Sequence, residues 1–131
     1  MAACDAVEQV AGFRPGVKWP NDLMVDGRKL AGVLAESRVV AAAVDALVGG
    51  VGLNVAQESF PAELAEIATS CRQVAGRAFD RADLLVAFLV ALDSRYAKLA
   101  QPAGLTDVLR EYRGACVTVG RAVRVDLADR S

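Results

Sequence analysis

The sequence contains no histidine. This absence excludes Ser-His-Asp and Cys-His catalytic systems and any His-ligated metal from the chain. Chemistry at a site built from these residues must therefore use Lys, Asp, Asn or Ser side chains, or backbone groups.

Cysteine is scarce, and its spacing does not suggest cross-links. Cys4, Cys71 and Cys116 are far apart, odd in number and without a C-x-x-C pair. This pattern fits reduced thiols better than a disulfide framework. We therefore expect three small core residues and a cytoplasmic protein.

The chain also lacks an excess of charge and a long apolar run. It carries 15 basic and 16 acidic residues, scattered along the sequence, so no basic stripe offers itself to nucleic acid. The longest apolar run, Leu84 to Leu92, is about half of the roughly 20 residues that a membrane span needs and is predicted to be a core helix. The first residues, Met1 to Ala11, lack the features of a signal peptide and predict an amphipathic helix. We expect neither a membrane partner nor a nucleic-acid partner for this segment.

At 131 residues with 54% hydrophobic content, the chain is long enough for one compact domain. Extended patterns at Val17 to Trp19 and from Leu23 to Leu34 surround the turn dipeptide Asp26-Gly27, which predicts a hairpin. The Val- and Gly-rich run Ala46 to Val55 predicts a buried central strand, and Arg38 to Asp45 a loop or helical turn. The fold class predicted is α+β, with a mixed or antiparallel sheet covered by helices.

The second half is predicted to be mainly helical. The expected elements are a short helix between Pro61 and Thr69, a long helix capped by Asp80 and closed by Pro102 and Gly104, a helix from a Thr106 cap to Gly114, and a hairpin over Val117 to Leu127 that turns at Gly120-Arg121.

The most unusual stretch is K-W-P-N-D at Lys18 to Asp22, followed by Lys29 and by A-G-V-L at Ala31 to Leu34. Together with G-V-G-L-N-V at Gly50 to Val55, it resembles the ordered signature of biotin protein ligases. Ala68 to Ser70 and Glu111 to Gly120 are similar to further segments of that family, the latter leading into its small SH3-like domain. The resemblance extends from about residue 2 to residue 127.

The resemblance implies the catalytic fold shared by class II aminoacyl-tRNA synthetases and biotin ligases. Residues 1–113 would form part of this catalytic domain, and residues 114–131 the beginning of the SH3-like domain. The Gly/Arg-rich G-R-G-R-x-G-R loop that such ligases carry upstream of this region is not in the sequence, so we expect a domain shortened at both ends.

The implied activity is that of an ATP-dependent ligase. It would convert biotin to biotinyl-5′-AMP and transfer biotin to a lysine of a biotin carboxyl carrier protein, with ATP and biotin as substrates and Mg²⁺ as cofactor. Two alternatives stay open: a non-catalytic fragment that binds nucleotide weakly or needs a complementing segment, and, in third place, a relative of lipoate ligases. The sequence leaves the oligomeric state open, and a homodimer is one possible assembly.

Hairpin geometry singles out one lysine. If Asp26 and Gly27 form the turn, then Asp22, Met24, Lys29 and Ala31 project from one side, which places a carboxylate and an ammonium on a common face. An ammonium on a flexible stem can follow a carboxylate as it becomes an acyl phosphate. Lys29 is therefore the predicted catalytic residue, and the resemblance implies its contact with the biotin carboxylate and the α-phosphate.

The remaining candidates complete a binding surface. Asp22 would help to hold Mg²⁺, Asn21 would donate to phosphate or ribose, Gly32 would let the ligand lie against the strand, and in the family the position of Asn54 meets adenine. The predicted substrate-binding residues are Lys18, Asn21, Asp22, Lys29, Gly32, Leu34, Gly50 and Asn54.

Purely structural interpretations exist for several of these residues. Asp22 and Lys29 would then be a surface pair worth well under ~1 kcal/mol, Gly32 a bulge and Asn54 a strand-end cap. Trp19, next to Pro20, is interpreted as a packing residue. A dinucleotide-binding G-x-G-x-x-G loop is rejected, because Val55 occupies the place of the third glycine.

Overall fold

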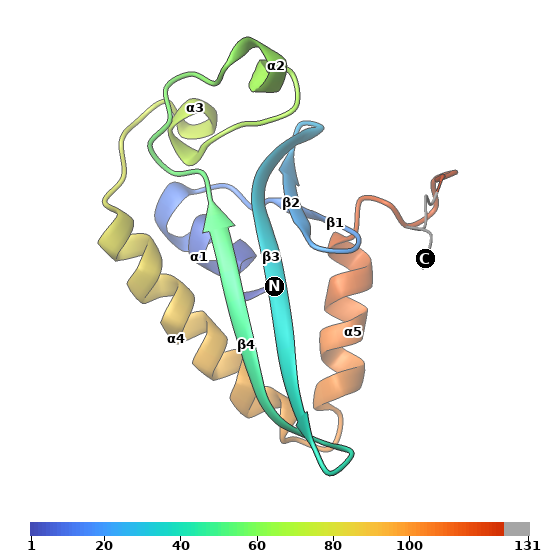
Figure 1. Cartoon of the computed structure of the whole chain (residues 1–131). Helices are drawn as coiled ribbons and strands as arrows, with labels where there is room; N and C mark the ends of the chain where they lie inside the picture. The colour runs from blue at the N-terminus through green and yellow to red at the C-terminus, as the bar shows by residue number, and fades with distance from the viewer. Residues whose placement is uncertain (125–131) are drawn as a thin grey trace.

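The computed structural model of the protein describes residues 1–124 and combines one antiparallel sheet with helices (Figure 1). The predicted α+β class is confirmed. In chain order the elements are α1 (Ala2–Ala11), β1 (Gly16–Lys18), β2 (Asp22–Val25), β3 (Arg28–Val40), β4 (Ala43–Leu53), α2 (Ala62–Ala65), α3 (Cys71–Ala75), α4 (Arg81–Leu99) and α5 (Gly104–Ala115).

The four strands follow one another in the sheet in the order β1-β2-β3-β4. The predicted turn at Asp26 and Gly27 is confirmed, with positive φ angles of 48° and 77°. A second, longer hairpin joins β3 to β4 through Ala41 and Ala42, whose φ angles are also positive. The prediction of a loop or helical turn over Arg38 to Asp45 is therefore wrong. The strands continue into this segment, where Arg38 pairs with Ala46, because their backbones satisfy one another along the whole hairpin.

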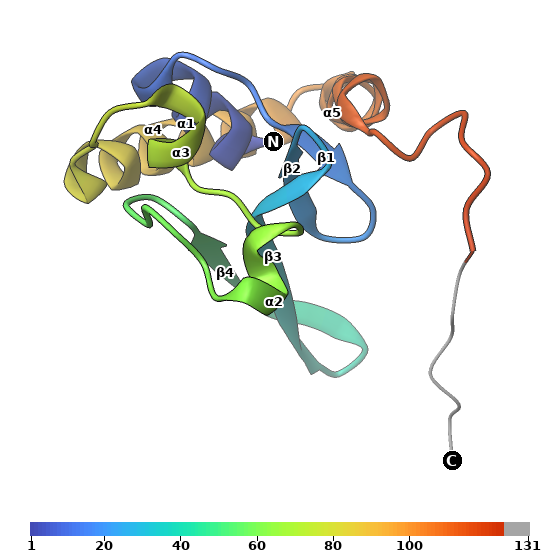
Figure 2. The same cartoon turned by 90° about the horizontal axis from the view of Figure 1, so that it is seen from above.

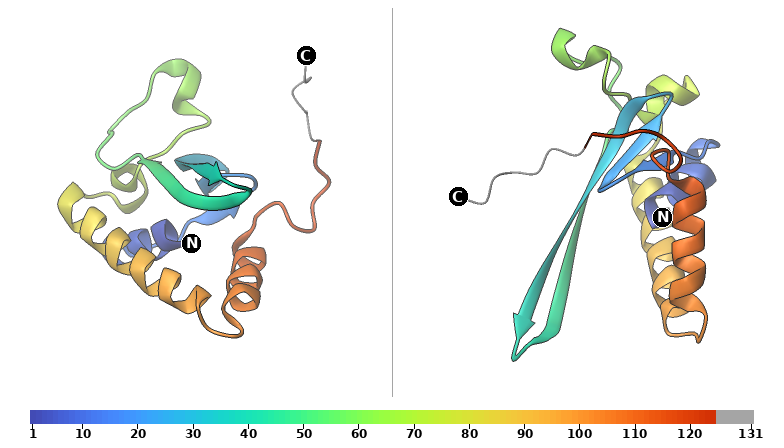
Figure 3. Two further views of the ribbon diagram at one scale, coloured as in Figure 1. Left: turned by 60° about the horizontal axis from the view of Figure 1, so that its bottom comes forward. Right: turned by 90° about the vertical axis from the view of Figure 1, so that its right-hand side faces the viewer.

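The helices α1, α4 and α5 lie on the same side of the β3–β4 hairpin (Figures 2 and 3). Two buried clusters join this side of the sheet to α1. One contains Val7 and Leu30, and the other contains Cys4, Leu23 and Ala31. The helices thereby stabilise the base of the hairpin and do not cover its other face.

A register shift lies where β2 meets β3. Met24 pairs with Lys29 but Leu23 pairs with Ala31, so Leu30 is the extra residue of a bulge. The bulge explains why two consecutive residues, Leu30 and Ala31, are both buried, at 0% and 2% exposure. Beyond it, the alternation of β3 is displaced by one residue.

The prediction of a buried central strand is wrong for β4. This strand has only β3 beside it among the described strands, and Leu47 and Val48 are each more than 65% exposed.

The prediction of a core helix over Leu84 to Leu92 is only partly right. Leu84 of α4 is buried against the core cluster, whereas Leu85 and Leu89 are exposed, because α4 packs one stripe against α1. No helix among residues 1–124 is long and apolar enough to cross a membrane.

Helix ends test the predicted caps. Asp80 caps α4 as predicted, since its Oδ1 accepts a hydrogen bond of 2.8 Å from the amide of Ala82. The predicted Thr106 cap is wrong, because α5 begins two residues earlier, at Gly104. Gly104 is buried, and a Cβ at this position would clash with the Lys98 carbonyl. Gly104 thus opens α5 instead of closing α4.

The hairpin expected over Val117 to Leu127 is not present in its described part. Residues 117–124 form turns and irregular chain, and residues 125–127 lie outside the described residues. Instead, a single parallel bridge joins Cys116 to Val17 of β1.

An ion-pair network ties three helices together beneath the sheet. Arg95 of α4 donates to both Asp5 of α1 and Glu111 of α5, and Arg14 lies 2.9 Å from Asp5. Burial raises the pKa of the Asp5 carboxyl, but hydrogen bonds and charges from Arg95 and Arg14 outweigh burial and hold it below its ordinary value. The folded state therefore favours the ionised carboxylate.

This network predicts a loss of stability in acid. The contribution of Asp5 is complete above the pKa of an unfolded aspartate, about 3.9, and is lost as the pH falls through the lower pKa of the folded state. We expect the free energy of unfolding, measured by urea titration at a series of pH values, to fall more steeply below about pH 4 in the parent than in Asp5→Asn. Parallel acid curves for the two proteins would contradict this role of Asp5.

Candidate functional site

One row of cross-strand partners runs across all four strands of the sheet. Lys18 pairs with Asp22, Asp22 with Gly32, and Gly32 with Gly52. Because cross-strand partners project to the same face, these four positions share the face opposite the buried Leu23 and Ala31. Lys18 and Asp22 thus project away from the helices.

Lys29 and Asp22 meet on this face. The Lys29 ammonium lies 2.6 Å from Oδ1 of Asp22, and the two side chains are 48% and 20% exposed. The backbone of Lys29 is fixed as well, because its amide donates to Ile67 at 2.7 Å and its carbonyl accepts from the Thr69 amide at 2.9 Å. The predicted pairing of a carboxylate with an ammonium is therefore confirmed, on a backbone held from both sides.

The Oδ1 atom of Asp22 is buried and pairs electrostatically with the Lys29 ammonium. Among the described residues, no donor, the ammonium included, meets this oxygen in hydrogen-bonding geometry. No three His, Cys, Asp or Glu side chains within residues 1–124 converge on a metal site. Asp22 is the predicted metal ligand on this face, and its Oδ1 contacts the Lys29 ammonium at 2.6 Å.

Glycines form a floor beside the ion pair. A Cβ on Gly32 would lie 3.4 Å from both Cε and Nζ of Lys29, whereas a Cβ on Gly52 would meet nothing within 4 Å. Gly50 pairs with Leu34 two residues further along the hairpin, and Leu34 is 63% exposed. A flat ligand can therefore approach the backbone of β3 and β4 next to the ammonium.

Both predicted asparagines hydrogen-bond to β3 through their backbones. Asn21 follows the β1 strand, is exposed, and accepts a hydrogen bond of 2.8 Å from Val33 through its carbonyl. Asn54 follows β4; its backbone amide donates to Leu30 at 3.0 Å and its side-chain amide donates to the Thr69 carbonyl at 3.1 Å. Asn54 is thereby tied to the same segment, Ile67 to Thr69, that fixes Lys29.

Two sequence-based placements are corrected. Ala31 does not lie beside Asp22 and Lys29, because the bulge at Leu30 turns it into the core opposite Leu23. Trp19 is not a packing residue: it is 57% exposed. The error at Ala31 arose because an uninterrupted hairpin register was assumed.

Three contributors to the site were not predicted from the sequence. Gly52, not named as a ligand residue, is the partner of Gly32. Thr69, fully buried, braces Lys29 and Asn54, and Thr118 contacts the turn that bears Asn21. Period-two alternation along β4 from Gly50 would have pointed to Gly52. Thr69 and Thr118 lie within the two further segments that resemble the family, but nothing local in the sequence indicates the contacts that they make.

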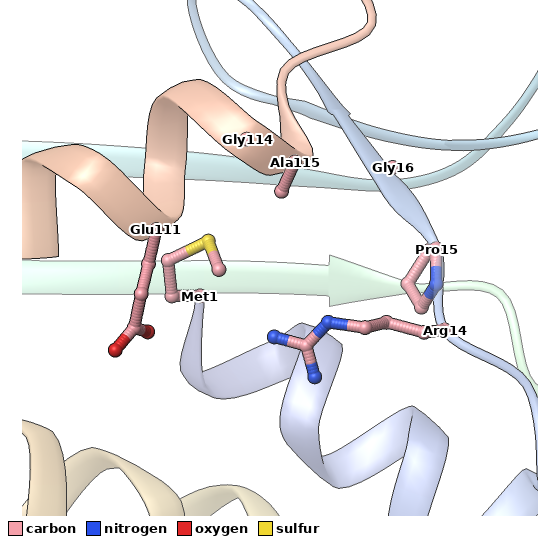
Figure 4. Close-up of a pocket in the computed structure, with 7 residues that line it drawn as sticks. All are labelled: Met1, Arg14, Pro15, Gly16, Glu111, Gly114 and Ala115. Atoms are coloured by element: carbon pink, nitrogen blue, oxygen red, sulfur yellow. The ribbon is translucent and has the colours of Figure 1, made fainter.

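Separate cavities lie away from this face. One of about 500 Å³ opens between α1, β1 and α5, and Figure 4 shows Arg14 and Glu111 at its rim. Another, of about 340 Å³, lies between β4 and α4 and is lined by apolar residues such as Leu53 and Phe88. Neither contains a residue of the predicted substrate-binding set.

The cysteines are free thiols. Cys4 and Cys71 are buried, and burial raises the pKa of the Cys71 thiol to about 11, as expected for packing residues. Cys116 is partly exposed, so the prediction of a core position does not hold for it.

A family model described as the biotin/lipoate A/B protein ligase family matches residues 2–54, the segment that carries Lys18 to Asn54. The chain belongs to this family. The bifunctional ligase/repressor BirA of Bacillus subtilis is 38% identical over 98 residues, which cover 73% of this chain and 30% of that protein. The biotin–[acetyl-CoA-carboxylase] ligase of Mycobacterium tuberculosis is 36% identical over 132 residues, which cover 97% of this chain and 46% of that enzyme.

Solved structures agree with these relatives. The apo structure of the biotin protein ligase of Aquifex aeolicus aligns with a TM-score of 0.79 and 25% identity, over 91% of this chain and 52% of that chain. A variant of the same ligase in complex with biotin aligns with the same TM-score. The chain therefore spans about half or less of the length of these members of the biotin/lipoate ligase family.

Proposed function

We propose that this chain carries part of the active site of an ATP-dependent biotin protein ligase. The observation that supports this most directly is the ion pair of Lys29 and Asp22 beside the glycine floor of Gly32 and Gly52. The face presents an ammonium, a carboxylate and open backbone at one place, as an acyl-adenylate requires.

In the proposed first step, a carboxylate oxygen of biotin attacks the α-phosphorus of ATP. A bond forms between that oxygen and phosphorus, the bond to the bridging oxygen breaks, and pyrophosphate leaves with the electron pair. Negative charge builds on the α-phosphate oxygens, where the Lys29 ammonium would stabilise it. Lys18 and Asn21 would contact phosphate or ribose, Leu34 and Gly50 would lie along the ligand, and Asn54 would meet adenine.

Asp22 is the residue that would hold Mg²⁺. Its Oδ1, which is buried and lies 2.6 Å from the Lys29 ammonium, is a carboxylate oxygen of the kind that a hard cation takes together with phosphate oxygens and several waters. The cation would neutralise charge on the ATP phosphates while Lys29 remains on the reacting carboxylate.

The second proposed step is transfer. The ε-amine of a lysine on a biotin carboxyl carrier protein attacks the acyl carbon of biotinyl-5′-AMP, the bond to AMP breaks, and an amide forms with loss of one proton.

A cytoplasmic location is part of the proposal. It is supported by the free thiols and by the proposed substrates, ATP and biotin. The exposed edge of β4 would support pairing with a second copy, which light scattering can measure.

Pyrophosphate release tests this proposal. The purified chain is incubated with biotin, ATP and Mg²⁺, alone and after fusion to the Gly/Arg-rich segment that resembling ligases carry. We expect biotin-dependent pyrophosphate release, strongest in the fusion. A fusion that folds but releases none would refute the proposed function, and lipoate replacing biotin equally well would favour the lipoate branch.

Gly32→Val should block the glycine floor. The first atom of the new side chain would already lie 3.4 Å from the Lys29 ammonium, and the branches would extend over the backbone that the ligand needs. We expect biotin-dependent pyrophosphate release to fall by about tenfold or more. The matched control is Gly49→Val, on the other face of β4 beside Ala35, which should release pyrophosphate as the parent does. Equal activity of the two variants would contradict the placement of the ligand.

A further inference from the structure

The turn between β1 and β2 is fixed by a segment almost a hundred residues away. It consists of Trp19, Pro20 and Asn21, flanked by the paired residues Lys18 and Asp22. Because proline has no amide proton, Trp19 and Asn21 supply the amide donors of this turn. Its conformation therefore depends on few hydrogen bonds.

The turn is anchored at each end by a different element. The Asn21 carbonyl accepts from the amide of Val33 in β3 at 2.8 Å. At the other end, the Trp19 amide donates to the Thr118 hydroxyl oxygen at 3.3 Å. The second anchor comes from the chain that leaves α5.

Packing holds this chain segment against β1. The Val117 amide donates to the Val17 carbonyl at 2.8 Å, and Val117 lies over Gly16 so closely that a Cβ on Gly16 would be 2.5 Å from its Cγ1 atom. Figure 4 shows the end of α5 at Ala115 near Gly16 of β1. Cys116 adds a contact of 3.2 Å between its sulfur and the Thr118 hydroxyl.

We propose that Thr118 is a positioning residue for nucleotide binding: it fixes the Trp19 amide and thereby orients Lys18, Asn21 and Asp22. The inference rests on the proposed function, since these three residues are its phosphate and cation contacts. The segment after α5 thereby has a role in the active site, although it lies outside both the K-W-P-N-D motif and the row of cross-strand partners.

Trp19 makes the contact measurable without any substrate, because it is the sole tryptophan of the chain. Thr118→Val keeps the shape of the side chain and removes the acceptor, while Thr118→Ser keeps the acceptor. Gly16→Ala displaces Val117 by a separate route. We expect acrylamide to quench Trp19 fluorescence more strongly in Thr118→Val and Gly16→Ala than in the parent, with Thr118→Ser and the control Thr106→Val unchanged.

Kinetics then separate positioning from mere structure. In pyrophosphate release, the KM for ATP should rise about fivefold in Thr118→Val, the equivalent of one hydrogen bond, with kcat nearly constant. Thr118→Ser should restore the parental KM. Unchanged quenching in Thr118→Val, an unchanged KM despite increased quenching, or failure of Thr118→Ser to restore KM would each overturn the proposal.

Failure of the proposed function looks different. If the parent fusion releases no pyrophosphate, the ligase proposal and the positioning role fall together, whatever the quenching experiment shows. If the parent is active, only the behaviour of the Thr118 and Gly16 variants decides.

Discussion

Lys29→Ala should reduce biotin-dependent pyrophosphate release by about 100- to 1000-fold, the usual cost of removing one preorganised group that stabilises charge in a transition state. The ammonium lies 2.6 Å from Asp22, and its backbone is fixed by Ile67 and Thr69, so its position is set before substrate arrives. The measurement is pyrophosphate release from biotin, ATP and Mg²⁺ by the fusion described above.

A folding defect would not explain such a loss. Lys29 is 48% exposed, and truncation of its side chain leaves its backbone hydrogen bonds to Ile67 and Thr69 in place. Lys98→Ala, in the last turn of α4, is the matched control and should keep parental activity. If the Lys29→Ala fusion were as active as its parent, the assignment of this lysine would be wrong.

Leu30→Ala should lower the free energy of unfolding by about 2–5 kcal/mol. Leu30 has 0% exposure and joins β3 to Val7 of α1 and to Leu84 of α4 in one core cluster. Truncation removes apolar contacts and leaves a cavity under the bulge that positions Lys29. Urea unfolding followed by circular dichroism measures the change.

Leu34→Ala provides the comparison within the same strand. Its side chain is 63% exposed, so the same truncation should change the free energy of unfolding by less than about 1 kcal/mol. Similar losses for the two variants would show that the bulge does not direct Leu30 into the core.

The bulge also marks a limit of the sequence analysis. The turn at Asp26 and Gly27 and the pairing of Met24 with Lys29 were predictable, because the dipeptide favours the two-residue turn and pairing follows from it. The placement of Ala31 was not, because a bulge arises from the packing of Leu30 against helices distant in the sequence. The exposure of β4 escaped prediction for a similar reason: an apolar strand looks the same in sequence at the centre and at the edge of a sheet.

The sequence by itself determined the local chemistry. K-W-P-N-D, Lys29 and the glycines of β4 identified the family and the face-sharing of Asp22 and Lys29, because turn type and strand alternation are properties of neighbouring residues. Only the tertiary structure decided that Gly52 completes the row with Lys18, Asp22 and Gly32, that Thr69 braces Lys29 and Asn54, and that Thr118 holds the Trp19 amide. These contacts join residues up to 99 positions apart, and no local preference encodes which distant group a backbone amide will meet.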